Sequence, residues 1–222
     1  NGIDLQQYKN QLGTINPPNR VFVDLAFLGT LPEGEFYNGF AEMLKYALIK
    51  DNELFEEIKS FSEEKDFQRI EIIEKCIQIK VDIVDGDLHE DGERKLLNFG
   101  HTVGHAIEGY FLESAAPVSH GHAVALGMCA EAYLSMNMGI LAKDDYKIIE
   151  KVLTRVYPFI KLADADTKAI IELMHNDKKN EAGKIYCVLL QGIGLSSYHN
   201  ELSENQIGEA LLHISMLSDV YN

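Results

Sequence analysis

Most apolar residues of this chain recur at the three- and four-residue spacing that places them on one face of a helix. The spacing is clear over residues 33–50, where Phe36, Phe40, Leu44 and Leu48 repeat every fourth position. The same pattern predicts further helices over residues 51–59, 68–88, 94–111, 144–156, 166–175 and 202–217. Residues 123–141 are apolar nearly all round, which is typical of a helix buried at the centre of a fold.

Two stretches have the composition of strands. Val21–Asp24 is β-branched and aromatic and predicts a short strand, whereas residues 1–19 are polar and loop-like. Residues 184–190 predict another strand, and the glycines at 192 and 194 predict a turn back through residues 196–199. The predicted fold class is therefore mainly α: one multi-helix domain over residues 1–222, with a short N-terminal strand and a small β-hairpin near residues 184–199.

The chain is acidic, with a formal net charge of -15 over 222 residues. This balance argues against binding nucleic acid through a basic surface and against binding an anionic membrane. No signal peptide is visible in the given residues, and no apolar run reaches about 18 residues, the length of a membrane span. Three widely separated cysteines suggest neither a disulfide framework nor a zinc ribbon. They fit a reducing compartment, so a cytoplasmic location is expected.

His101 and His105 carry the clearest chemical signal, because residues four apart lie on one face of a helix. Two imidazoles placed in this way can bind one metal, or one can bind metal while the other moves a proton. Gly100 and Gly104 have the same spacing, and each costs about 1 kcal/mol relative to Ala within a helix. A helix that accepts this cost twice is expected to approach another backbone closely. From spacing alone, a metal or catalytic role and an ordinary structural role are about equally supported.

Glu42 and His120 are the residues that could complete a metal site. Glu42 lies among apolar residues, where a carboxylate without a partner is costly to bury. Glu42 could instead form an ion pair with Lys45 or lie on a solvated helix face. His120 could equally belong to the polar first turn of a helix. If Glu42, His101 and His120 converge, two histidines and one carboxylate leave coordination positions open for water and substrate, as a catalytic metal requires.

The remaining candidates are individually weak. The cations Lys45, Lys80, Arg94, Lys178 and Lys179 would each be surface charges by default. Glu172 and His175 form half of a di-iron Glu-x-x-His pair, but a second copy is absent, so a ferritin-like site is rejected. No Gly-rich phosphate loop lies at a strand–helix junction.

Taken together, several segments resemble the C-terminal domain of the 3-dehydroquinate synthase family. The resemblance runs from Lys9-Asn10 to about Asn180. It rests on Leu31-Pro32, the segment 39–45 (GFAEMLK), Lys80, the segment 94–105 (RKLLNFGHTVGH), His120-Gly121 and Asp177-Lys178-Lys179. No single piece is specific, but the combination is. His122 departs from the family, which usually has Glu at this position, and offers a competing ligand.

The resemblance implies a role for each matched residue. Glu42, His101 and His120 match the ligands of a divalent metal, either zinc or cobalt. His105, Lys45 and Asn98 match catalytic positions. The residues that match substrate-binding positions are Lys9, Asn10, Lys80, Arg94 and Lys178, and Lys9 and Asn10 also match contacts to the cofactor NAD.

The resemblance further implies a two-domain enzyme of which this chain is the second domain. The family's N-terminal NAD-binding α/β domain has no counterpart here, and residues 1–19 would be the lead-in between the domains. The isolated domain is therefore expected to be inactive, and a homodimer is expected because the family is commonly dimeric.

The implied reaction converts a phosphorylated sugar acid, 3-deoxy-D-arabino-heptulosonate 7-phosphate, to 3-dehydroquinate with loss of phosphate. This is a step of the shikimate pathway of aromatic amino acid biosynthesis. Three alternatives stay open: another sugar-phosphate cyclase, an iron-type polyol dehydrogenase domain, and a noncatalytic helical interaction module. The dehydrogenases typically offer Asp as their first ligand and lack the set Lys80, Arg94 and Asn98.

Overall fold

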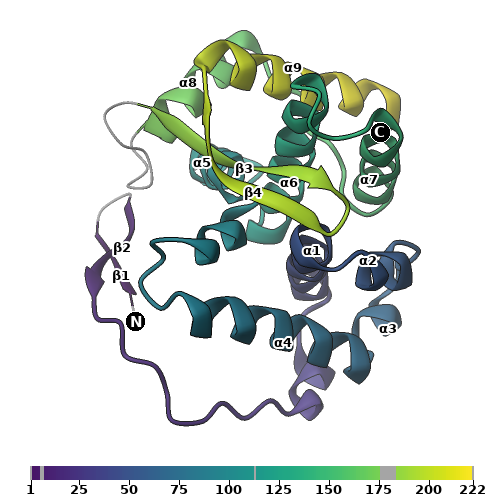
Figure 1. Ribbon diagram of the computed structural model, residues 1–222. Coiled ribbons are helices and arrows are strands. Elements are labelled where there is room, and N and C mark those ends of the chain that lie inside the picture. The colour runs from purple at the N-terminus through teal and green to yellow at the C-terminus, as the bar shows by residue number, and fades with distance from the viewer. Residues whose placement is uncertain (1, 6–7, 113, 176–183, 222) are drawn as a thin grey trace.

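The structure is a computed structural model that describes residues 2–5, 8–112, 114–175 and 184–221. Helices make up most of it, as the hydrophobic spacing predicts (Figure 1). The α-helices are α1 (Glu33–Lys50), α2 (Asn52–Ile58), α3 (Glu64–Phe67), α4 (Ile70–Gly86), α5 (His101–Phe111), α6 (His120–Asn137), α7 (Lys143–Val156), α8 (Asp164–His175) and α9 (Glu204–Tyr221). Two 3₁₀-helices accompany them, η1 (Leu25–Thr30) and η2 (Glu93–Asn98).

Helix α6 forms the centre of the fold. It contacts α1, α5, α7, α9 and strand β3, and its residues from Ala123 to Ala132 are all buried. This confirms the central helix expected from residues that are apolar on every side. The buried side chains of the surrounding helices form one continuous core with those of α6. No helix in the described ranges is both long and apolar enough to cross a membrane.

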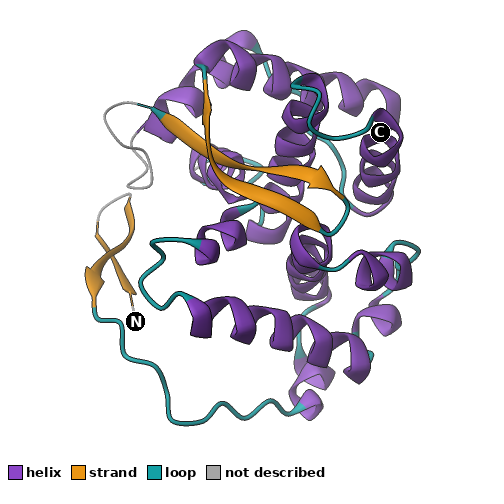
Figure 2. Cartoon of the chain, in the orientation of Figure 1, coloured by secondary structure: helices purple, strands orange, loops and turns teal. Residues whose placement is uncertain are grey.

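The predicted hairpin is confirmed as an antiparallel pair of strands, β3 (Ile185–Gly192) and β4 (Leu195–Leu202). Figure 2 shows it in orange, lying across the helices. Strand β3 is mostly buried and packs on α6, whereas β4 is largely exposed. The helix after the hairpin begins as predicted, because Ser203 and Gln206 exchange side-chain and backbone hydrogen bonds in a capping box.

The N-terminal segment differs from expectation in its details. The strands lie in the stretch predicted to be loop-like, where β1 (Gly2–Leu5) pairs antiparallel with β2 (Tyr8–Gly13). Val21–Asp24 belongs to no strand, so the predicted position of the N-terminal strand is wrong, although the chain does form strands near its N-terminus. Residues 14–31, called here the N-terminal arm, run along the outside of the molecule to α1 (Figure 1).

The predicted single helix over residues 94–111 is also wrong, since it is two helices meeting at Phe99 and Gly100. Gly100 has a φ of +74°, in the left-handed region that only glycine adopts without strain. The chain therefore turns at Gly100, and α5 starts with His101 as its first residue.

Candidate metal centre

Close packing of α5 against α6 sets the position of the histidines. A Cβ atom on Gly127 would lie 2.0 Å from the carbonyl oxygen of Gly100 and 2.7 Å from the backbone nitrogen of Gly104. On the other helix, a Cβ on Gly104 would lie 2.9 Å from the carbonyl oxygen of Ala123. Real Cβ atoms cannot approach backbone this closely, so glycine is required on both helices. The close backbone approach predicted from Gly100 and Gly104 is confirmed.

A second contact fixes the start of α6 against α1. The side-chain oxygen Oδ1 of Asn38 accepts hydrogen bonds from the backbone N–H of Gly121 and from the hydroxyl of Ser119, both at 2.9 Å. These bonds satisfy a backbone donor that a helix start leaves without an intrahelical partner. Gly121 packs directly over Asn38, since a Cβ there would lie 2.3 Å from the Asn38 Cα. His120, the first residue of α6, is therefore held beside the helix that carries Glu42.

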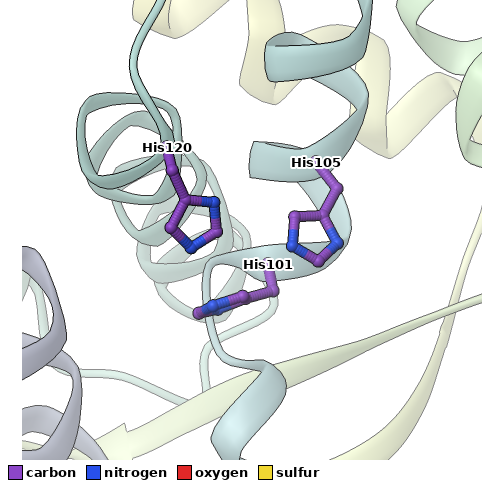
Figure 3. Close-up of side chains that lie close together, drawn as sticks. All are labelled: His101, His105 and His120. Atoms are coloured by element: carbon purple, nitrogen blue, oxygen red, sulfur yellow. The ribbon is translucent and has the colours of Figure 1, made fainter. Parts of the chain in front are cut away.

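These two contacts bring three imidazoles together. The ring centroids of His101 and His105 are 5.2 Å apart, those of His101 and His120 are 5.5 Å apart, and those of His105 and His120 are 5.7 Å apart. One ring nitrogen from each residue lies within 4.8 Å of the other two. Figure 3 shows the three side chains pointing toward one another from α5 and α6.

Glu42 faces this cluster from α1. Its Oε1 lies 3.3 Å from Nε2 of His101, and its Oε2 accepts a hydrogen bond of 2.5 Å from the ammonium group of Lys45. Burial alone would raise the pKa of Glu42, but the contact with His101 and the positive charge of Lys45 outweigh it and lower the pKa to about 2. The carboxylate is therefore ionised at neutral pH.

In the contact between Glu42 and His101, two hydrogen-bond acceptors face each other. Nδ1 of His101 lies 3.0 Å from the carbonyl oxygen of Phe99, which can only accept, so Nδ1 carries the hydrogen. Burial lowers the pKa of His101 more than the negative charge of the neighbouring Glu42 raises it, and this favours the neutral ring. In a neutral ring Nε2 then presents a lone pair to a carboxylate oxygen. Two electron-rich atoms facing each other in this way are stabilised by a positive ion between them.

The separation of these two atoms also fits a metal. Ligand bonds of about 2.0–2.2 Å in tetrahedral geometry put neighbouring ligand atoms roughly 3.3–3.6 Å apart, close to the 3.3 Å between Glu42 Oε1 and His101 Nε2. His120 and His105 supply further nitrogen atoms on the same side. The described residues thus offer one carboxylate and three imidazoles, of which His105 is the ring not predicted to be a ligand.

The other predicted residues that the structure describes come from η2, α4 and β2. Arg94 and Asn98 belong to η2, where the Arg94 guanidinium donates to the carbonyl oxygen of Leu88 and the Asn98 amide donates to Glu90 at 2.6 Å. Lys80 lies on the exposed side of α4. Lys9 and Asn10 are part of β2, and Lys178 and Lys179 lie outside the described residues.

A cavity of about 320 Å³ lies beside Asn98, between η2 and the hairpin. Its lining is mainly polar and aromatic: Glu90, Asp91, Lys95, Asn98, Thr102, Tyr186, Cys187, Val188, Tyr198 and His199. Glu90 and His199 are the two non-glycine residues with positive φ in the described ranges. Backbone strain of this kind is found preferentially at functional sites.

Sequence reasoning missed three polar side chains that hold the predicted ones. Asn38 of α1 accepts a hydrogen bond from the first turn of α6, and Glu90 accepts one from the amide of Asn98. Glu108 is the third, and its Oε2 lies 3.0 Å from Nδ1 of His120. One signal for Glu108 was present, because position 108 is seven residues after His101 and falls on the same helix face as both α5 histidines.

Comparison with known proteins identifies the family to which the chain belongs. Residues 39–180 match the family model described as 3-dehydroquinate synthase C-terminal. The chain is 34% identical over 212 residues to the 3-dehydroquinate synthase of Parabacteroides distasonis, a match covering 95% of this chain and 60% of the relative. With the enzyme of Thermodesulfovibrio yellowstonii, the identity is 37% over 209 residues, covering 91% and 57%. The chain thus spans about 60% of the length of these relatives.

Two solved structures have the same fold. A 2-epi-5-epi-valiolone synthase from Streptomyces hygroscopicus subsp. jinggangensis, solved with NAD+ and Zn2+ bound, superposes with a TM-score of 0.82 at 25% identity, covering 97% of this chain and 61% of that one. A 2-deoxy-scyllo-inosose synthase complexed with carbaglucose-6-phosphate, NAD+ and Co2+ superposes with a TM-score of 0.77 at 24% identity, covering 95% and 60%. The likeness to the second structure concerns the fold alone.

Proposed function

Since the chain belongs to the 3-dehydroquinate synthase C-terminal family, we propose that it supplies the metal and substrate site of a 3-dehydroquinate synthase. This enzyme would be a carbon–oxygen lyase that converts 3-deoxy-D-arabino-heptulosonate 7-phosphate to 3-dehydroquinate and phosphate. The observation that carries the proposal is the convergence of Glu42, His101, His105 and His120 from three helices.

Glu42, His101 and His120 are proposed as the ligands of a zinc or cobalt ion. The donor set supports this, because imidazole and carboxylate groups suit such metals and three protein ligands leave positions open. When bound, the metal supplies Lewis-acid chemistry that lowers the pKa of a substrate hydroxyl. Lys45 is only 4% exposed and donates a hydrogen bond to Glu42. It is proposed to bind a substrate oxygen beside the metal.

His105 is proposed to move protons rather than to bind the metal. Its ring is half-buried and adjoins both His101 and His120. Histidine is the usual side chain for proton transfer near neutral pH. Asn98 lines the neighbouring cavity and is proposed to orient the substrate there.

Lys9, Asn10, Lys80, Arg94 and Lys178 are proposed to bind the substrate's carboxylate and phosphate. Among them Arg94 has the planar fork that binds such groups through two parallel hydrogen bonds. Lys9 and Asn10 are proposed to contact NAD as well. When bound, NAD supplies the oxidation and reduction of the substrate's ring alcohol.

The N-terminal arm supports a further domain in the working enzyme. Its Val21, Phe22 and Phe27 are exposed, Phe22 by 86%. Large apolar side chains gathered on one segment are typical of a surface that packs on a partner. We propose that residues 1–19 lead in from an NAD-binding α/β domain and that the chain is inactive without it. Cys76, Cys129 and Cys187 are buried and form no disulfide within the described residues, which suits the proposed cytoplasmic location. A homodimer is proposed for the complete enzyme.

Reconstitution tests this function. The chain is mixed with a separately produced N-terminal domain of a relative, a divalent metal, NAD and the heptulosonate phosphate, and released phosphate is measured. Phosphate release that requires both polypeptides is expected, and a pair carrying His101→Ala should lose both metal and activity. No release from a folded, metal-loaded pair would contradict the proposal.

A second candidate is another sugar-phosphate cyclase. This candidate is supported by the TM-score of 0.82 with a 2-epi-5-epi-valiolone synthase at 25% identity. Substituting sugar phosphates that lack the carboxylate in the same assay separates the candidates. Turnover of such a sugar phosphate in place of the heptulosonate phosphate would support this cyclase instead.

A further inference from the structure

We propose that Glu108 is a positioning residue that holds His120 in the tautomer and orientation needed to bind the metal. The inference rests on the proposed metal centre and assigns a role to a carboxylate outside its ligand set. Glu108 Oε2 lies 3.0 Å from Nδ1 of His120, and the Glu108 side chain is only 16% exposed. The contact joins the third turn of α5 to the first residue of α6.

The chemistry of the contact defines which ring nitrogen can bind a metal. An ionised carboxylate only accepts hydrogen bonds, so Nδ1 of His120 must carry the hydrogen that points to Glu108. The lone pair of the neutral ring then lies on Nε2, the nitrogen on the other side of the ring. A carboxylate behind a ligating histidine both fixes the ring and makes its free nitrogen more basic.

His120 needs such support more than His101 does. His101 is buried, and its Nδ1 donates to the carbonyl oxygen of Phe99 within its own chain segment. The His120 side chain is 39% exposed and belongs to the first residue of α6, so less of its surface is packed against the protein than that of His101. Glu108 thus does for the exposed ligand what a backbone carbonyl does for the buried one.

The position of Glu108 on its helix supports the same role. Residues 101, 105 and 108 share one face of α5, because they are four and three positions apart. One rigid helix face therefore presents two imidazoles to the cluster and one carboxylate to the third imidazole. The Gly100, Gly104 and Gly127 contacts hold α5 at the distance from α6 that lets the carboxylate reach His120.

Zinc binding by the full chain tests the inference. Affinity is measured by competition with a chromogenic chelator for wild type, Glu108→Ala, Glu108→Gln and His120→Ala. We expect Glu108→Ala to weaken zinc binding by about 10- to 100-fold, the usual cost of losing an outer-shell partner. Glu108→Gln keeps a hydrogen-bond acceptor and should recover part of the loss. The matched control is Glu204→Ala, which removes a carboxylate from another histidine, since Glu204 Oε1 lies 2.8 Å from His175 Nε2.

A second readout separates positioning from a purely structural role. In the metal-free chain, nitrogen chemical shifts of the His120 ring report which nitrogen carries the hydrogen. The Nδ1–H tautomer is expected in wild type, and a mixture of both tautomers in Glu108→Ala. Because Glu108→Gln preserves size and shape, it keeps the test valid if Glu108→Ala does not fold.

Each unfavourable outcome has a distinct meaning. If both Glu108 variants bind zinc within about two-fold of wild type, the loss is far smaller than that of removing an outer-shell partner. The positioning role is then wrong, while the proposed metal centre stands. If Glu108→Ala abolishes binding as fully as His120→Ala, then Glu108 is itself a ligand and the inference is again overturned. If wild type binds no zinc, the proposed metal centre fails, and this inference fails with it.

Discussion

Glu42 Oε1 lies 3.3 Å from Nε2 of His101, a nitrogen whose lone pair is directed at the carboxylate because Nδ1 donates to the carbonyl oxygen of Phe99. The two residues are 59 positions apart and come from different helices. The proposed metal site includes this pair, because an ionised carboxylate and a neutral imidazole are both groups that a divalent cation binds.

Removing the charge of Glu42 should therefore abolish tight metal binding. In Glu42→Gln we expect zinc affinity to fall by more than about 100-fold, because losing a ligand costs more than losing an outer-shell partner. Chelator competition at neutral pH measures the change. Glu33→Gln, an exposed change on the same helix, is the control and should bind zinc as wild type does. Equal affinities in the two variants would remove Glu42 from the ligand set.

A methyl group at Gly127 should separate α5 from α6. The new Cβ would lie 2.0 Å from the Gly100 carbonyl oxygen, which is backbone and cannot rotate away. We expect Gly127→Ala to destabilise the fold by about 1–3 kcal/mol, the cost of overpacking, and to weaken zinc binding as the histidines move apart. Urea unfolding and chelator competition measure both effects.

Gly109→Ala is the matched control for that change, since it lies on α5 and its Cβ would meet only Leu173 Cδ1 at 3.9 Å. Alanine favours the helix, so the free energy of unfolding should stay the same or rise by up to about 1 kcal/mol. If both glycine variants behave alike, close helix packing does not position the site.

The spacing of apolar residues was sufficient to predict most helices, the central position of α6 and the hairpin, because burial on one face leaves a period in the sequence. It could not show the break at Gly100, since a left-handed φ leaves no trace in hydrophobic periodicity. Val21–Asp24 has strand-forming residues, but in this structure no neighbouring strand pairs with it. Strand propensity alone does not supply a partner.

For the candidate site, the sequence could likewise predict the main residues but not the partners that hold them. The i,i+4 histidines and glycines pointed to a site with close helix packing, and both histidines do face His120. The hydrogen bonds from Gly121 to Asn38 and from His120 to Glu108 join residues 83 and 12 positions apart. No local pattern specifies such pairs, because they depend on how separate helices meet.

Asn38 provides a test of how α6 is anchored. Asn38→Ala removes the acceptor for the Gly121 N–H and the Ser119 hydroxyl. We expect a loss of about 1 kcal/mol, typical of a missing helix cap. Because the Asn38 amide also donates to Glu35 Oε2 at 3.0 Å, Asn38→Asp is made together with Glu35→Gln; this pair keeps an acceptor oxygen in place without two facing carboxylates and should lose less. Thermal unfolding of the metal-free chain compares the two, and an unchanged stability in Asn38→Ala would show that this contact does not anchor α6.

Stability should also depend on pH through His213, which is far along the chain from the metal centre. Its ring stacks on Tyr133 at 4.0 Å and lies 3.5 Å from the Glu150 carboxylate, with Tyr146 hydrogen-bonded to the same nitrogen and Lys147 paired to Glu150. Burial lowers the pKa of His213 below its ordinary 6.5, and Glu150 only partly opposes this. The unfolded chain therefore takes up the proton first as pH falls.

It follows that the contribution of His213 is complete above pH 6.5 and is lost as the pH falls through its lower folded pKa. We expect the free energy of unfolding to decrease less between about pH 7.5 and pH 5 in His213→Asn than in wild type. Urea unfolding at several pH values measures the slopes. A steeper slope in the variant would mean that the pKa of His213 is raised in the folded chain.

Glu42, His101 and His120 are proposed to bind one metal ion, with His105 outside its coordination sphere. Crystals of the chain grown with zinc, with diffraction data collected on both sides of the zinc absorption edge, test this most directly. We predict a single anomalous peak within bonding distance of Glu42 Oε1, His101 Nε2 and His120 Nε2. A peak bound by His101, His105 and His120 with Glu42 still on Lys45, or no peak at the cluster, would contradict it.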